Sequence, residues 1–97
     1  MNTRPDTPPP MAEVQRRIAE AFNTYFDAFA IRITAEDVVA GAHRTLRQDG
    51  WAITYRVDGD ATGIPTLEFY ATHRSTNDRH VVIGPDGSVE HQDAIED

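Results

Sequence analysis

The chain has 97 residues, which suits one hydrophobic core, and the lack of cysteine excludes a disulfide framework, a thiolate nucleophile and a cysteine-based zinc site. Its formal net charge of -7 opposes tight binding to a phosphate backbone, and because all nine basic residues are arginine, a catalytic lysine is excluded. No stretch is apolar enough for a membrane span or a signal sequence, so we expect a cytoplasmic protein without a membrane anchor.

Residues 1–10 hold four of the six prolines and show no apolar periodicity. Such a composition predicts a disordered, solvated leader with polyproline character. A proline-rich docking peptide is the alternative, but short proline runs commonly serve as plain spacers.

An amphipathic helix is predicted over Met11–Phe29. Apolar side chains recur there at spacings of three and four, and polar side chains occupy the other side. Pro10 precedes the helix, where its missing N–H costs nothing. The apolar stripe consists of Met11, Val14, Ile18, Phe22, Tyr25, Phe26 and Phe29.

A second helix is predicted from Thr34 to about Gln48. Thr34 would cap it, acidic residues follow in the first turn, and Gly50 would supply a left-handed stop. Gly41 inside this helix would cost about 1 kcal/mol relative to alanine. The apolar face would consist of Val38, Val39, Ala42 and Leu46.

From Trp51 onward the apolar residues alternate with polar ones, which is typical of half-buried strands. Strands are predicted over 51–57, 65–73 and 79–84, with a fourth short strand possible over 88–91, and turns rich in glycine, proline and aspartate separate them. The expected fold is α+β, with two N-terminal helices on one face of a three- to four-stranded antiparallel meander.

Strand register can be predicted from burial, because a slip of one residue would move a whole apolar set into water. We expect one domain over residues 11–91, followed by an acidic, frayed tail over 92–97. The expected cross-strand pairs are Ile53 with Phe69, Tyr55 with Leu67, Ala71 with Val81 and Phe69 with Ile83.

The segment 73–80, with the sequence HRSTNDRH, places arginine and histidine on both sides of a predicted turn. Arginine and protonated histidine there could hold a phosphate, a carboxylate or an acidic loop of a partner. The simpler interpretation is that its central polar residues make the turn and its arginines keep the strand ends soluble. In the predicted register His73 and His80 point to opposite faces.

The solvent face of the predicted sheet carries tyrosine beside arginine, a combination typical of interface centres. Glu68 would lie there opposite Thr54 and form a surface ion pair with Arg56. We interpret this face, together with the 73–80 hairpin, as a candidate partner-binding surface. Its residues are Arg56, Tyr70, Thr72, His73, Arg74, Arg79, His80 and Val82.

Catalytic and metal motifs are missing from the sequence. The histidines are not spaced like a local metal motif, the serines lack a nucleophile context, and no glycine-rich loop precedes a helix. We therefore expect no metal and no cofactor, and the sequence favours a non-enzymatic role.

The hypothesis that follows is a small acidic protein-interaction module, of the inhibitor, immunity or adaptor kind or a homo-oligomer. The alternative is a ligand-binding or enzymatic domain with an aromatic pocket between helices and sheet. Nucleic-acid binding ranks third, since only the hairpin arginines favour it. The pocket would be lined by Phe22, Tyr25, Phe26, Phe29, Trp51 and Tyr55.

Overall fold

The computed structural model describes residues 10–59, 61, 63–74 and 76–92. The predicted disordered leader lies outside the described residues except for Pro10. The predicted frayed tail lies outside them except for Gln92, which ends a strand.

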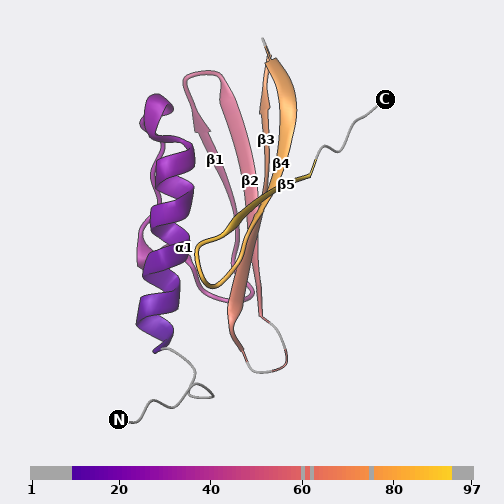
Figure 1. Ribbon diagram of the computed structural model, residues 1–97. Coiled ribbons are helices and arrows are strands. Elements are labelled where there is room, and N and C mark those ends of the chain that lie inside the picture. The colour runs from indigo at the N-terminus through magenta and orange to yellow at the C-terminus, as the bar shows by residue number, and fades with distance from the viewer. Residues whose placement is uncertain (1–9, 60, 62, 75, 93–97) are drawn as a thin grey trace.

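One α-helix packs against one face of a five-stranded antiparallel sheet whose strands follow one another in chain order (Figure 1). The predicted α+β class and antiparallel meander are confirmed, whereas the second helix and the count of three to four strands are wrong. The elements are α1 (Met11–Tyr25), the 3-10 turns η1 (Asp27–Phe29) and η2 (Ala35–Asp37), β1 (His43–Gln48), β2 (Trp51–Gly59), β3 (Pro65–His73), β4 (Thr76–Ile83) and β5 (Val89–Gln92).

Helix α1 begins where the sequence predicts it. The carbonyl oxygen of Pro10 accepts hydrogen bonds from the backbone N–H groups of Glu13 and Val14, at 3.0 and 3.2 Å. The helix ends at Tyr25, four residues earlier than expected, because η1 follows and Ala30 adopts a left-handed φ of 58° that redirects the chain. Val14, Ile18 and Phe22 of the predicted apolar stripe are buried in the core, whereas Met11 in the first turn is 42% exposed.

In place of the second predicted helix, the chain forms η2, an irregular segment and strand β1. Thr34 and Asp37 do form the expected capping interaction: the Thr34 N–H and hydroxyl both donate to one Asp37 carboxylate oxygen, at 2.7 and 3.0 Å. The capped element is only the three-residue turn η2. Gly41 has a φ of +88°, which a right-handed helix does not allow, so the chain turns there into β1.

Asp49 and Gly50 form the tight turn between β1 and β2 and join Gln48 to Trp51 as a cross-strand pair. Both turn residues have left-handed φ values, 52° and 86°, which match the right-handed twist of a two-residue hairpin. Gly50 therefore belongs to a hairpin turn between two strands, and its predicted role as a helix stop is wrong.

The register within the sheet differs from the predicted one by two residues. Ile53 pairs with Ala71 and Phe69 pairs with Val81, whereas we expected Ile53 opposite Phe69 and Ala71 opposite Val81. Tyr55 correspondingly pairs with Phe69 and not with Leu67. A shift of two preserves the face on which each side chain lies, since side chains alternate with period two.

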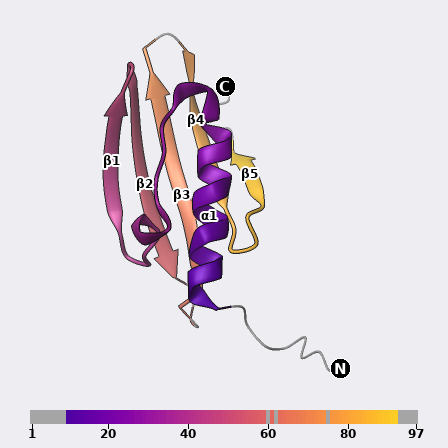
Figure 2. The same ribbon diagram turned by 90° about the vertical axis from the view of Figure 1, so that its left-hand side faces the viewer.

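The core lies between the sheet and a layer formed by α1 and residues 26–42, the segment between α1 and β1 that we call the connector. Figure 2 shows α1 crossing β3 and β4, with the connector passing over β2. All of the core side chains from the strands are at most 3% exposed. They are Trp51, Ile53, Tyr55, Val57, Leu67, Phe69, Ala71, Val81 and Ile83. Within the described part of the chain, no helix is long and apolar enough to cross a bilayer.

Candidate protein interface

The face of the sheet directed away from α1, which we call the outer face, carries no helix among the described residues (Figure 1). Polar and small side chains dominate it, because the apolar members of each strand point to the core. It is formed by His43, Thr45 and Arg47 on β1; Ala52, Thr54, Arg56 and Asp58 on β2; Thr66, Glu68, Tyr70 and Thr72 on β3; Asp78, His80 and Val82 on β4; and Glu90 on β5.

Glu68 lies at the centre of an ionic network on the outer face. One carboxylate oxygen is 3.4 Å from a guanidinium nitrogen of Arg56, and the other is 2.6 Å from Nε2 of His80. Arg56 also lies 3.2 Å from Asp58. The expected ion pair between Arg56 and Glu68 is therefore formed, although Glu68 lies directly opposite Arg56 and not opposite Thr54.

Tyr70 is the large aromatic side chain of this face and is 39% exposed. Its hydroxyl donates a hydrogen bond to Asp78 at 3.0 Å, and its ring meets the His80 ring edge-on at a centroid distance of 5.9 Å. The hydrogen bond to Asp78, then burial and the Asp78 charge, raise the pKa of Tyr70. These contacts hold an exposed ring in one orientation.

A shallow depression of about 240 Å³ lies beside Tyr70. Its volume is below the roughly 300–1,000 Å³ of typical small-molecule pockets, so it suits a single side chain of a partner. Among the described residues, no group of three histidines or acids is placed to hold a metal ion. The side chains that line it from the outer face are His43, Thr54, Arg56, Glu68, Tyr70 and His80.

The side chains of the 73–80 hairpin are distributed over both faces of the sheet. His73 lies on the core side with its ring 4.9 Å from that of Trp51, and Arg79 lies 5.7 Å from the same indole ring and donates to the Tyr25 hydroxyl at 3.4 Å. His80 lies on the outer face. The expected opposite orientation of the two histidines is thus observed, but the hairpin does not gather its positive charges at one place.

The remaining predicted interface residues are distributed as follows. Thr72 and Val82 belong to the outer face, and the Thr72 hydroxyl donates to the carbonyl oxygen of Ala52 at 3.4 Å. Arg74 is exposed at the end of the hairpin. The structure therefore brings together Arg56, Tyr70, Thr72, His80 and Val82, and it separates His73 and Arg79 from them.

The six aromatic residues of the alternative pocket pack against one another. Phe22 lies 5.1 Å from Phe26, Phe26 lies 5.8 Å from Trp51, and Trp51 lies 5.1 Å from Phe29, measured between ring centroids. Tyr25 meets Phe26 in the same way at 5.0 Å. The rings themselves occupy the space between the helix and the sheet.

Tyr55 has a buried hydroxyl without a hydrogen-bond partner among the described residues. Asp37 and Arg44, which form an ion pair of 2.9 Å, act on it electrostatically. Burial is the main cause that raises the pKa of Tyr55; the Asp37 charge adds to it, and Arg44 opposes it. This hydroxyl is a buried polar group within the aromatic cluster.

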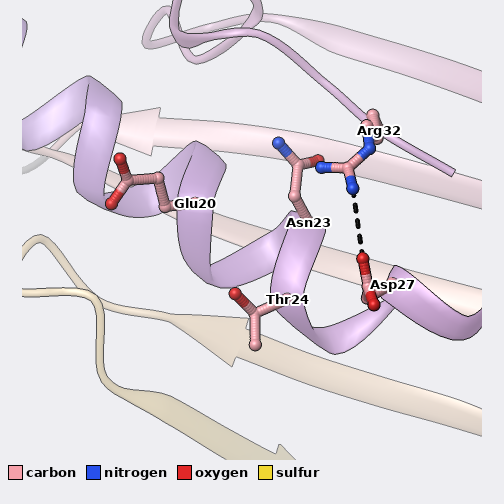
Figure 3. A pocket seen from close by; sticks show the side chains of 5 residues that line it. All are labelled: Glu20, Asn23, Thr24, Asp27 and Arg32. Atoms are coloured by element: carbon pink, nitrogen blue, oxygen red, sulfur yellow. Dashed lines mark hydrogen bonds and ion pairs between the residues drawn. The ribbon is translucent and has the colours of Figure 1, made fainter. Parts of the chain in front are cut away.

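Another depression, of about 470 Å³, lies at the C-terminal end of α1 (Figure 3). Arg32 and Asp27 form an ion pair of 3.1 Å across it, and the Asn23 amide is bonded to the backbone of Ile33. These side chains tie the connector to the helix. The depression is completed by Glu20 and Thr24.

Sequence reasoning missed His43, Thr45 and Arg47 as members of the outer face, because it assigned them to a helix. The signal that identifies them is the Asp49-Gly50 dipeptide, which favours a hairpin when strand-like residues flank it. No known protein family, curated protein or solved structure matches this chain. Its function therefore has to be inferred from the geometry of the outer face.

Proposed function

We propose that the protein is a small, cytoplasmic, non-enzymatic interaction module that binds a protein partner through the outer face. The observation that carries this proposal is Tyr70, an exposed aromatic ring that Asp78 and His80 hold in place on the middle strand of the outer face, which no helix of the described residues covers. Inhibitor, immunity or adaptor roles and self-association all use a surface of this kind.

The composition of the outer face supports a protein partner. Tyrosine and arginine dominate the binding energy of protein interfaces, and polar residues usually surround them. Tyr70 and Arg56 supply these two residue types, and Val82 adds a small apolar contact. Because the network around Glu68 already fixes Arg56 and His80, less side-chain entropy is lost on binding.

The charge of the outer face argues against nucleic acid as the partner. Arg47 and Arg56 are balanced there by several carboxylates, and the chain as a whole carries a net charge of -7. A phosphate backbone requires a surplus of positive charge to displace counterions. The outer-face carboxylates belong to Asp58, Glu68, Asp78 and Glu90.

The alternative of a ligand-binding or enzymatic domain is favoured by one observation, the unpartnered hydroxyl of Tyr55 among the described residues. A bound ligand could accept its hydrogen bond. Such a ligand would have to displace aromatic rings that now contact one another, so we prefer the outer face.

Site-specific photo-crosslinking tests the proposal. Position 70 would carry p-benzoylphenylalanine in place of tyrosine, and exposed Thr24 on α1 would be replaced in the same way in a matched control. On irradiation in the cells that produce the protein, position 70 should yield discrete adducts and position 24 should not. The absence of any adduct from position 70, including an adduct with a second copy, would overturn the proposal.

A further inference from the structure

We infer that the partner of the outer face is a second copy of this chain, packed sheet on sheet about a two-fold axis that runs along β3. This inference rests on the proposed function and narrows it to self-association. Three properties of the outer face carry it: the distribution of its charges, its symmetry and its area.

Charge is distributed unevenly across the outer face. Strands β1 and β2 contribute Arg47, Arg56 and one acid, Asp58. On the other side of the middle strand, β4 and β5 contribute Asp78 and Glu90 and no arginine to this face among the described residues, while Glu68 lies on β3 itself. The flank formed by β1 and β2 therefore carries a net positive charge, and the flank formed by β4 and β5 carries a negative one.

A two-fold axis along β3 makes this uneven distribution self-complementary. β3 is the middle strand of the five, so rotation about it places β1 of one copy over β5 of the other. The basic flank of each copy then faces the acidic flank of its partner, and Tyr70 and Glu68, which both lie on β3, each approach the same residue of the second copy. A two-fold axis perpendicular to the strands would place β1 over β1 and bring like charges together.

The register identifies two residues that should meet across this interface. His43 and Glu90 occupy the same cross-strand row, at opposite edges of the sheet, through Arg56, Glu68 and Val82. The two-fold rotation places His43 of one copy opposite Glu90 of the other. Neither side chain forms an ion pair with another described residue of its own chain, so both can contact a second copy.

The area is sufficient for a reversible dimer. The strands contain four to nine residues each. With a strand spacing of about 4.8 Å and a rise of about 3.3 Å per residue, the outer face covers roughly 600 Å². Two copies would bury on the order of 1,200 Å², which is the lower end of the range for specific interfaces. Packed sheets of this kind cross at about 30°.

The test measures the solution mass of the full chain by sedimentation equilibrium, from micromolar to millimolar concentration. We expect a monomer–dimer equilibrium. Tyr70→Asp should raise the dissociation constant at least about thirtyfold, since it places a charge at the centre of the interface. Val39→Asp is the matched control: Val39 is 50% exposed, lies on the connector and gains the same charge, so its dimer should be unchanged.

A charge exchange tests the two-fold arrangement itself. His43→Glu should raise the dissociation constant by about tenfold, because it sets two carboxylates opposite one another, whereas Glu90→Arg in the same chain sets an arginine opposite the new carboxylate. The double variant should restore the dimer. Both positions lie at exposed strand edges, and circular dichroism of each variant verifies its fold.

A chain that stays monomeric up to millimolar concentration would overturn the inference, as would a dimer that is indifferent to Tyr70→Asp. A double variant that does not recover the dimer would also overturn it. The proposed function fails separately. A monomer whose position 70 still forms adducts with another protein refutes only the second copy as partner, whereas a lack of any adduct refutes both.

Discussion

Asn23 on α1 and Ile33 in the connector are joined by a reciprocal pair of hydrogen bonds. The Asn23 amide nitrogen donates to the Ile33 carbonyl oxygen at 2.9 Å, and the Ile33 backbone N–H donates to Oδ1 of Asn23 at 2.8 Å. The side-chain amide thus gives an irregular segment the pairing that a strand neighbour would provide. It holds Ile31 and Ile33 against the core.

Asn23→Ala should therefore lower the free energy of unfolding by about 2 kcal/mol, because it leaves both backbone groups of Ile33 without this partner. Urea denaturation measures the change. Asn23→Asp keeps the acceptor for the Ile33 N–H and should lose less. Thr24→Ala, at the neighbouring exposed position, serves as the control and should be close to neutral. Equal stability of Asn23→Ala and wild type would contradict the structural role of this pair.

Two glycines with nearly the same backbone conformation should respond differently to alanine. At Gly41 (φ +88°) an added Cβ atom would enter open space, whereas at Gly50 (φ +86°) it would lie 2.8 Å from Nε2 of His73. Gly41→Ala should cost about 1 kcal/mol, the usual penalty of a left-handed residue. Gly50→Ala should cost more, since His73 packs on Trp51 and has to move.

Fluorescence of Trp51, which is the single tryptophan, reports this difference directly. The emission should change in Gly50→Ala and stay the same in Gly41→Ala. Equal stability losses with unchanged emission in both variants would show that His73 does not constrain the turn.

The contact between Glu68 and His80 should be measurable as a coupling energy. The 2.6 Å distance and the partial burial of both side chains favour a coupling of about 0.5–1 kcal/mol in a double-mutant cycle of Glu68→Ala and His80→Ala. Thermal or urea unfolding of the four proteins supplies the cycle. A coupling near zero would mean that the network does not hold the outer face in place.

Tyr55→Phe should leave the protein equally stable at neutral pH, or stabilise it by up to about 1 kcal/mol, because the buried hydroxyl has no partner to lose among the described residues. A loss of stability at neutral pH would reveal a partner for the hydroxyl.

The same substitution should change the response to alkaline pH. The pKa of Tyr55 is raised above its ordinary value of 10.0, so the folded chain keeps this proton after the unfolded chain has released it. The contribution of Tyr55 to stability is therefore fully present below pH 10.0 and falls as the pH rises above that value. Tyr55→Phe should show a smaller decrease than wild type in this range, measured by urea denaturation at several pH values.

For β2 and β3, the sequence predicted the side of the sheet on which each residue lies. Alternation in β2 and β3 placed Trp51, Ile53 and Phe69 in the core and Arg56 and Tyr70 in solvent. This pattern is local, and it survives a register error of two residues. Thr54, Arg56, Tyr70, Thr72 and Val82 were assigned to the outer face for that reason, whereas Asp58 and Asp78 were expected in turns.

The conformation of residues 34–48 was not predictable from apolar spacing. Val38, Val39, Ala42 and Leu46 fit a helical stripe, but β1 is an edge strand with exposed side chains on most positions and shows little alternation. Its conformation is stabilised by pairing with β2 and by the left-handed turn at Asp49-Gly50. The signal lay in the turn residues and not in the strand.

The sequence by itself determined the amphipathic helix α1, the alternating strands and therefore the two faces of the sheet, because periodicity and turn chemistry act between near neighbours. Only the tertiary structure decided the pairing across the strands: Glu68 lies directly opposite Arg56 and also contacts His80 in the neighbouring row. Register depends on packing between α1 and the strands, and such distant contacts leave no local mark on the sequence.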